Sequence, residues 1–196
     1  YTRTQGREFY DRVVERVGAL PGVESATVAR QAPMGVARLV SLHIQGRAGD
    51  AGTLMSEGGS YRTDNRTTVN VNVVGMRYFS TMGITLARGR DFSSADAAEA
   101  PPVAIVSQAF ADRHFAGENP VGQRISTSGP RGQWREIIGV AGDSKYQSLL
   151  EDRMTFASLP ISQNHETGVT LLIRASSDPA ALADAKIPKA VHDSKS

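Results

Sequence analysis

The sequence predicts an α+β fold with mixed or antiparallel sheets. Two observations lead to this expectation: segments typical of strands outnumber amphipathic helical segments, and the two kinds follow one another in an irregular order. A regular alternation of strand and helix would indicate a parallel sheet instead. With 196 residues, the chain is long enough for one large domain or two small ones built around a real hydrophobic core.

The chain begins with an amphipathic helix that leads into a strand. Apolar side chains recur at helical spacing opposite a charged face. These apolar positions are Phe9, Val13, Val17 and Leu20. Pro21-Gly22 ends the helix, and Val23–Ala29 then predicts a strand. Arg38–Gln45 predicts a second, weaker strand, whereas Gly46–Arg66 is rich in Gly, Ser, Asp and Arg and predicts a long mobile loop.

The middle of the chain combines strands with two short helices. Thr67–Val74 alternates strictly between apolar and polar residues, which predicts a half-buried strand of an antiparallel sheet with one wet face. Met76–Met82 predicts a short helical turn. Val103–Val106 is apolar throughout and predicts a buried strand. Ser107 is then placed to cap a helix that runs through Phe115 and turns its phenylalanines inward.

The last third predicts a hairpin, a strand and a helix. Arg124–Thr127 and Trp134–Ala141 flank a Ser-Gly-Pro turn, so we expect them to pair as a hairpin. Val169–Ala175 is a further apolar strand. A final helix is expected from Pro179, because Pro is favoured at the first helical position. Pro188 would interrupt that helix, so we expect fraying from there.

Composition excludes several classes of function. The chain carries 22 Lys and Arg against 20 Asp and Glu, and a net excess of +2 over the whole chain gives no field for gripping the phosphates of a nucleic acid, so no nucleic-acid partner is predicted. The absence of Cys excludes disulfides, thiolate nucleophiles and Cys-ligated metals. Hydrophobic residues at 40% and charged residues at 21% are typical of a folded globule rather than of a disordered chain.

The hydropathy pattern predicts no membrane span and no signal peptide within these residues. The longest apolar stretches, Pro101–Val106 and Ile137–Gly142, are strand-sized, whereas a spanning helix needs about 20 consecutive apolar residues. The sequence also opens on Tyr1 rather than on Met. We therefore expect the chain to be a fragment of a longer protein.

The four histidines predict no metal centre. They are scattered along the chain at His43, His114, His165 and His192. None has a second His or a carboxylate at ligand spacing, and Asp112 is two residues from His114, so the two do not share a helix face. Surface or partly buried histidines are the simpler interpretation.

The patterns of common catalytic and phosphate-binding sites are also absent from the sequence. Neither Gly-x-Ser-x-Gly nor Ser-x-x-Lys occurs. Glu151-Asp152 and the pair Asp91 and Asp96 lie in polar segments, which predicts ordinary solvated charges rather than paired catalytic carboxylates. Gly139–Lys145 is the nearest approach to a phosphate loop, but it lacks the required spacing and contains an Asp, so a strand entering a turn is the simpler interpretation.

Two other groups of residues allow a binding interpretation beside a structural one. The arginines of the first helix fit an anionic partner, but Glu8 lies four residues before Arg12, as on a solvated helix surface. Tyr78, Phe79 and Met82 fit a partner-binding patch, but residues of these types are more often core. The sequence therefore assigns no catalytic, cofactor-binding or metal-binding residue, and predicts neither a cofactor nor enzyme activity.

Several ordered blocks of sequence do match a known pattern. Tyr78–Phe92 contains Tyr-Phe-Ser-Thr-Met-Gly followed by Ala-Arg-Gly-Arg-Asp-Phe, and it is followed in order by Pro102–Val106, Gly117–Gly122 and Trp134–Asp143. Together with the helix and turn of Phe9–Val23, these blocks resemble the MacB-like periplasmic core domain of ABC transporter permeases of the MacB/FtsX type. Several blocks in one order are more specific than a single motif.

The resemblance extends from the first helix to Ala185, with local departures. Thr85 stands where such permeases often have Pro, and Ser158 stands where a Tyr often precedes the block at Pro160. The end of the chain does not follow the family. The resemblance implies a porter-like α/β subdomain formed by residues 1–45 and 136–196, with a β-rich subdomain of residues 46–135 inserted into it.

For function, the resemblance implies the periplasmic domain of a membrane protein, held outside the cell membrane by transmembrane helices absent from this chain. The domain would couple cytoplasmic ATP hydrolysis to substrate export, as in efflux, or to mechanical signalling and partner docking. The implied partners are a cytoplasmic ABC ATPase subunit or domain, a periplasmic adaptor and a second permease copy in a dimer. The resemblance carries over no catalytic residue.

Two other classes of function stay open at this stage. The β-rich centre is compatible with a stand-alone extracytoplasmic binding module for a lipid, lipoprotein or peptide, which a preformed apolar cavity would favour. An enzyme of unrecognised type would require His114 or His165 to be buried beside a carboxylate in a cleft.

Overall fold

The computed structural model describes residues 3–32, 38–47, 55–57, 60–62, 68–142, 154–176 and 187–193. The helices are α1 (Arg3–Gly18), α2 (Tyr78–Met82), α3 (Gln108–His114) and α5 (Ile187–Asp193). The strands are β1 (Val23–Ala29), β2 (Arg38–Ser41), β3 (His43–Ile44), β4 (Met55–Glu57), β5 (Ser60–Arg62), β6 (Thr68–Val74), β7 (Leu86–Gly89), β8 (Val103–Ser107), β9 (Arg124–Ser126), β10 (Trp134–Ala141), β11 (Phe156–Pro160) and β12 (Thr170–Ala175). Helices, parallel pairs and antiparallel pairs together confirm the α+β prediction.

Seven strands form a closed ring, which we call the barrel, and two of them, β2 and β3, follow one another along one side of it. Around the ring the strands follow the order β6, β11, β8, β10, β9 and β3. The ring closes because β2, which directly precedes β3 in the chain, pairs with β6. Leu42, between β2 and β3, is buried where the chain passes from one pairing to the other. Closure removes free edges from these strands.

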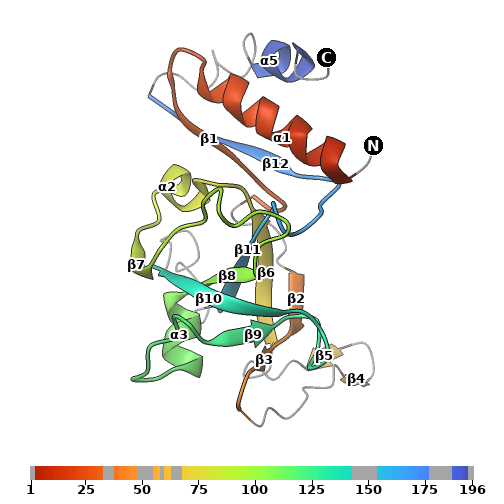
Figure 1. Ribbon diagram of the computed structural model, residues 1–196, viewed down its shortest axis with the longest axis vertical. Helices are drawn as coiled ribbons and strands as arrows, with labels where there is room; N and C mark the ends of the chain where they lie inside the picture. The colour runs from red at the N-terminus through yellow and green to blue at the C-terminus, as the bar shows by residue number, and fades with distance from the viewer. Residues whose placement is uncertain are drawn as a thin grey trace.

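The inside of the barrel is a single apolar core. Alternation places one face of each strand inward, as with Val69, Val71 and Val73 of β6 and with Ala104 and Val106 of β8. Helix α3 contributes Phe110 to the same cluster, and the residue that follows the helix, Phe115, joins it. Ser107 caps this helix, as predicted, because its Oγ accepts a hydrogen bond from the backbone N–H of Phe110 at 3.2 Å. Figure 1 shows α3 below β10.

A second cluster covers the outer side of β8 and β10. Val103 and Ile105 of β8 pack there with Tyr78, Phe79 and Phe92. Helix α2 and strand β7 supply the cover, and β7 pairs with the end of β10, at Gly139–Ala141, beyond the residues that pair with β9. Tyr78 and Phe79 are therefore core residues, as the structural interpretation of this segment predicted.

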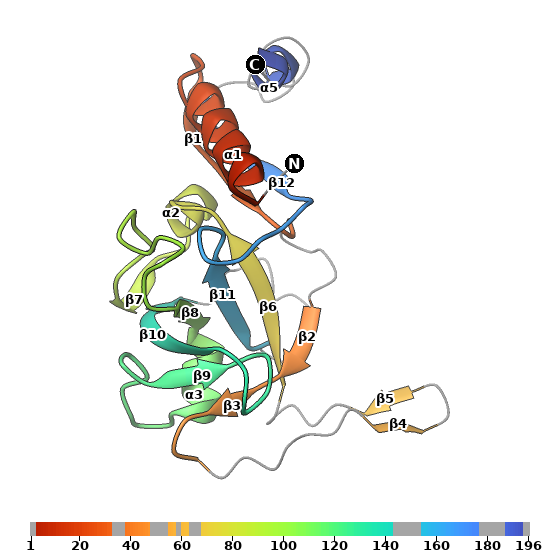
Figure 2. The ribbon, with the colours of Figure 1, turned by 45° about the vertical axis from the view of Figure 1, so that its right-hand side comes forward.

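The ends of the described chain form a separate α/β unit, which we call the layer. Strands β1 and β12 pair antiparallel, and α1 and α5 lie beside one another next to them. The small core between helices and strands contains Val13, Val17, Ala26 and Ala190. In Figures 1 and 2 the layer lies at one end of the molecule and the barrel at the other.

Several predicted elements differ from the observed ones. Arg38–Gln45 was expected to be one strand, but the bend at Leu42 divides it into β2 and β3. The predicted loop 46–66 contains the two short strands β4 and β5, which pair with each other. Strand β6 pairs parallel with β11 and antiparallel with β2, so its sheet is mixed rather than antiparallel.

The expected fraying from Pro188 is wrong. Helix α5 begins at Ile187, and Pro188 occupies its first turn, where a missing backbone N–H removes no intrahelical hydrogen bond. The helix predicted from Pro179 falls on residues 177–186, which lie outside the described ranges.

Sequence patterns assign no strand to Phe156–Pro160, which forms β11 between β6 and β8. The segment Phe-Ala-Ser-Leu-Pro contains no β-branched residue and ends in Pro, so its local strand propensity is weak. Its neighbours in the barrel stabilise the extended conformation, because Ala157 and Leu159 fill interior positions.

Candidate functional site

The junction between the layer and the barrel is the candidate functional site. Strand β1 pairs with β6 only where Ala29 faces Val74. Two backbone hydrogen bonds flank this pair: Gly75 N–H donates to Val28 O, and Arg30 N–H donates to Val73 O, both at 2.7 Å. The sheet thus passes from barrel to layer through a single short contact.

Side chains of the layer reinforce this contact by reaching α2. Ser25 Oγ lies 2.5 Å from Thr81 Oγ1, and Thr27 Oγ1 donates to Met76 O at 2.9 Å. From β12, Arg174 Nε donates to Thr81 O at 2.9 Å. Helix α2 is therefore hydrogen-bonded to both strands of the layer.

Apolar packing runs through the same place. Ala29 of the layer belongs to one buried cluster with Val74 and Phe79 of the barrel side, and Leu172 of β12 packs against it. Because polar and apolar contacts both cross the junction, the layer and the barrel are joined as one continuous body.

A groove of about 610 Å³ runs along this junction. Its walls come from α1, from β1, from the β6–α2 connection and from the segments 92–97 and 160–162. Desolvation raises the pKa of Asp11 on the α1 wall, against the opposing effect of Arg7. Charged and apolar side chains are mixed along the groove, as the lining residues Arg7, Asp11, Val14, Glu24, Arg77, Phe92 and Ile161 illustrate.

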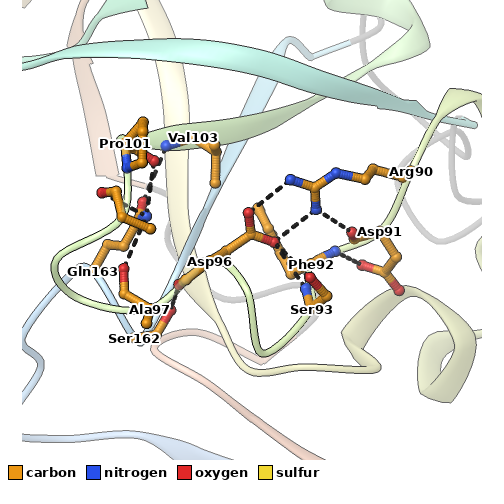
Figure 3. Close-up of polar contacts among 11 residues, drawn as sticks. Arg90, Asp91, Phe92, Ser93, Asp96, Ala97, Pro101, Val103, Ser162 and Gln163 are labelled. Carbon is orange, nitrogen blue, oxygen red and sulfur yellow. Dashed lines mark hydrogen bonds and ion pairs between the residues drawn. The ribbon is translucent and has the colours of Figure 1, made fainter.

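Asp96 anchors the barrel-side wall of this groove (Figure 3). The side chain is only 4% exposed and forms a two-point ion pair with Arg90, at 2.7 Å and 2.8 Å. The backbone N–H of Ser93 donates to the same carboxylate at 2.9 Å. The hydrogen bond and charge of Arg90 lower the pKa of Asp96, while its burial acts in the opposite direction.

The same segment is tied to the loop after β11. Ser162 Oγ donates to Asp96 O at 2.5 Å. The Gln163 amide accepts from Val103 N–H at 3.0 Å and donates to Pro101 O at 3.0 Å (Figure 3). These contacts fix the loop against the start of β8. The cluster is structural, because its donors and acceptors bind one another.

Asp96 corrects the expectation that Asp91 and Asp96 are ordinary solvated charges. Asp96 is buried, and desolvation also raises the pKa of Asp91, whose carboxylate accepts a hydrogen bond from Phe92 N–H at 2.7 Å. The sequence carried a usable signal, since Ser93 lies three residues before Asp96 in a turn-forming pattern and Arg90 is close in the chain.

The histidines lie in different parts of the fold. His43 is on β3, His114 on α3, His192 on α5, and His165 is exposed near the barrel. His114 is buried, and its Nε2 has no hydrogen-bond partner among the described residues. Burial, with help from Arg113 and Arg47, lowers its pKa from 6.5 to about 4.

The neighbours of His114 favour a structural role. Its ring lies 4.6 Å from that of Phe110, and its backbone carbonyl accepts a hydrogen bond from Arg47. Arg47 also forms an ion pair with Glu118 at 2.6 Å and lies over the ring of Phe115. The groups that shift the pKa of His114 are cations, not the carboxylate that an enzymatic interpretation requires.

The remaining sequence predictions can be compared with the structure only in part. Arg12 and Arg16 lie on the exposed face of α1, although Arg7 reaches the groove. Gly139–Gly142 completes β10 and its exit, whereas Asp143 to Lys145 and the pair Glu151-Asp152 lie outside the described residues. No group of three potential metal-ligating side chains gathers within the described ranges.

Several solved structures have a similar fold. The chain matches the periplasmic region of MacB from Actinobacillus actinomycetemcomitans with a TM-score of 0.59 at 15% identity, over 94% of this chain and 73% of that one. It matches the extracellular domain of the ABC-type transporter YknZ from Gram-positive bacteria with a TM-score of 0.57 at 13% identity, over 95% and 83%. A domain of a putative permease from Porphyromonas gingivalis gives 0.53 at 16% identity, over 87% and 70%.

These matches show that the chain shares the fold of these periplasmic and extracellular domains. Residues 4–187 match the family model described as MacB-like periplasmic core domain, so the chain belongs to that family. It is a domain of the extracytoplasmic part of MacB-type permeases, not a catalytic fold.

A curated relative supports the same assignment. The macrolide export ATP-binding/permease protein MacB of Sodalis glossinidius is 28% identical over 190 residues, which cover 90% of this chain. The chain spans only 26% of the length of that relative. Among the described residues, no helix combines the length and the apolar character that crossing a membrane demands.

Proposed function

We propose that this domain transmits movement as a rigid lever in an ABC permease. ATP is hydrolysed by a cytoplasmic ATPase, transmembrane helices join the domain at the layer, and the barrel is carried at the far end, where a periplasmic adaptor docks. One observation supports this proposal above all. The first and last described helices, α1 and α5, lie side by side in the layer, and the barrel lies beyond a continuous junction (Figure 2).

The contacts at the junction support a lever rather than a hinge. The Ala29–Val74 pairing, the hydrogen bonds of α2 and the shared apolar cluster would all have to break for the two parts to rotate freely. A relay also requires that its partner bind the domain differently in two states, because equal affinity shifts no equilibrium. Formation of a permease dimer places two such levers side by side.

A reversible cross-link tests the lever in the full-length permease. Ser25→Cys with Thr81→Cys places two thiols where the native oxygens are 2.5 Å apart, and the 196 residues of this chain contain no other Cys. Oxidation should leave both ATP hydrolysis and export unchanged. A macrolide is the first substrate to assay, because the relative is a macrolide export protein. Loss of export on oxidation, restored by a reductant, would show that the junction must hinge.

A loosened junction completes the test. Phe79→Ala removes a buried ring from the shared cluster and should reduce export several-fold while ATP hydrolysis persists. Oxidation of the cysteine pair in this background should restore export, because the cross-link replaces the lost packing. The control pair His43→Cys with Ser126→Cys joins two neighbouring barrel strands and should not restore it.

The predicted division into residues 1–45 with 136–196 and residues 46–135 remains part of this proposal. Strand pairing joins β10 and β11 to β8, across the predicted boundary. Limited proteolysis distinguishes the units: fragments that begin or end near 45 and 135 support the proposed division. Fragments bounded near 30 and 169 would instead make the layer and the barrel the units.

A further inference from the structure

The mouth of the barrel opposite α3 contains a cavity of about 350 Å³. Its floor is aliphatic, because interior positions of three barrel strands reach it: Val40 of β2, Val71 and Val73 of β6, and Leu159 of β11. The mouths of β-barrels are common places for small-molecule sites, and this volume lies at the small end of their range.

A buried arginine lines this cavity. Arg135 precedes Ile137 by two residues on β10, so alternation places it on the inner face of the barrel, and it is only 6% exposed. Its guanidinium donates to Gln133 Oε1 at 2.8 Å and to Asn164 Oδ1 at 3.0 Å, which are both uncharged acceptors. Its Nε has no partner among the described residues. Burial lowers the pKa of Arg135, as expected for a desolvated cation.

Two further arginines surround the same mouth. Arg38 alternates with Val40 on β2 and is exposed at the rim. Arg30 pairs with Glu166 at 3.3 Å, and Glu166 is the only carboxylate among the described residues that line the cavity. Three guanidinium groups against one carboxylate leave an excess of two positive charges.

We propose that the barrel mouth binds a phosphate monoester, whose phosphate meets the arginines and whose organic group covers the aliphatic floor. A phosphate monoester carries a charge of about −1.5 to −2 at pH 7, which matches the excess of two, whereas a carboxylate would neutralise half of it. Guanidinium groups also bind phosphate oxygens through paired N–H donors. The proposal is independent of whether the domain acts as a lever.

Calorimetry on the purified chain with phenyl phosphate tests the site. Phenyl phosphate should bind measurably at low ionic strength, and at least about fivefold more tightly than inorganic phosphate, which leaves the floor uncovered. Benzoate should bind about tenfold more weakly than phenyl phosphate. Absence of heat with phenyl phosphate at millimolar concentration, or equal binding of benzoate, would overturn the proposal.

Matched variants locate the binding. Arg38→Gln changes an exposed rim residue, so the fold should persist, and affinity for phenyl phosphate should fall about tenfold. Arg135→Lys keeps the positive charge of the buried donor but should still lower the affinity for phenyl phosphate, because an ammonium lacks the planar set of N–H donors of a guanidinium. Arg88→Gln, an exposed arginine on β7 away from the mouth, should change affinity less than twofold. Equal affinity of the Arg38 and Arg88 variants would place any bound phosphate elsewhere.

The same chemistry occurs in free metabolites and in lipid headgroups. Co-sedimentation with vesicles of phosphatidylcholine containing phosphatidic acid distinguishes the two sources. Arg38-dependent sedimentation with these vesicles supports a lipid monoester. Binding of phenyl phosphate without sedimentation supports a soluble ligand. If the chain neither binds phenyl phosphate nor sediments with these vesicles, the proposed site is contradicted.

Discussion

The barrel and the layer are stabilised in different ways. The barrel encloses a large core in which bulky rings such as Phe110 and Phe115 are almost completely buried, and its ring of strands has no open end. The layer has a small core centred on Val13 and Val17, and β1 meets a barrel strand only at Ala29. We expect the barrel to define the stability of the domain and the layer to open more readily, since local stability follows buried apolar contact.

The largest expected effect is the loss of a barrel ring. Phe110→Ala removes a fully buried side chain and should lower the free energy of unfolding by about 3–5 kcal/mol. Val17→Ala in the layer removes two methyl groups and should cost about 2 kcal/mol. Hydrogen exchange would separate the two: Phe110→Ala should speed exchange throughout, and Val17→Ala in α1, β1 and β12 first. A similar global pattern for both would remove the distinction between the parts.

Acid should act on the barrel through His114. Its folded pKa of about 4 lies below 6.5, so between these pH values the unfolded chain binds a proton that the folded chain does not. Stability should therefore fall as the pH falls from 6.5 to 4, by up to about 3 kcal/mol. Urea unfolding of the wild type and of His114→Leu across this range measures the effect. A parallel pH dependence of the two proteins would contradict it.

A pair of glycine substitutions probes the barrel cover. Gly89 has φ +72° and a Cβ there would lie 2.1 Å from Ile138 O, so Gly89→Ala adds a backbone clash to conformational strain. We expect a loss of at least about 2 kcal/mol. Gly117 has φ +79° with open space around it, so Gly117→Ala should cost only about 1 kcal/mol of strain. Thermal denaturation compares the two variants. Equal losses of stability would mean that β7 moves away from Ile138 at no cost and would contradict the prediction.

The smallest effect is expected where the two parts meet. Asp96→Asn should lower stability at pH 7 by about 1 kcal/mol, because Arg90 is half exposed and solvent screens the pair. The folded pKa of Asp96 is lowered, so its contribution is present above pH 4 and is lost as the pH falls further. The difference between wild type and variant should thus vanish near pH 2. Glu118→Gln, in an exposed pair, is the control and should change stability by less than about 0.5 kcal/mol.

Local patterns predicted the elements that are stabilised locally. The capped helix after Ser107, the alternation of β6 and the hairpin of β9 and β10 all follow from short-range chemistry, and the structure contains each. Phe156–Pro160 was missed because its extended conformation depends on β6 and β8, which are distant in sequence. Closure of the barrel through the bend at Leu42 was missed for the same reason.

The two sites differ in how far the sequence anticipated them. The sequence predicts a solvated charge at Asp96. Its burial could not be predicted, because it depends on contacts with Ser162 and Arg90 that form only in the folded chain. Arg135 carried a signal, since it precedes Ile137 in an alternating segment, but only the closed barrel turns that face into an interior. The family resemblance predicted the class of protein and said nothing about either residue.

The bend at Leu42 also bears on how the chain reaches its native state. The pairing of β3 with β9 brings His43 and Ile44 together with Ser126 and Ile125, which lie far away in the sequence. Closing such a long loop has an entropic cost, which must be met before this pairing forms. Such high contact order slows folding, and the final pairing comes late. We therefore expect this domain to fold more slowly than a helical domain of the same size.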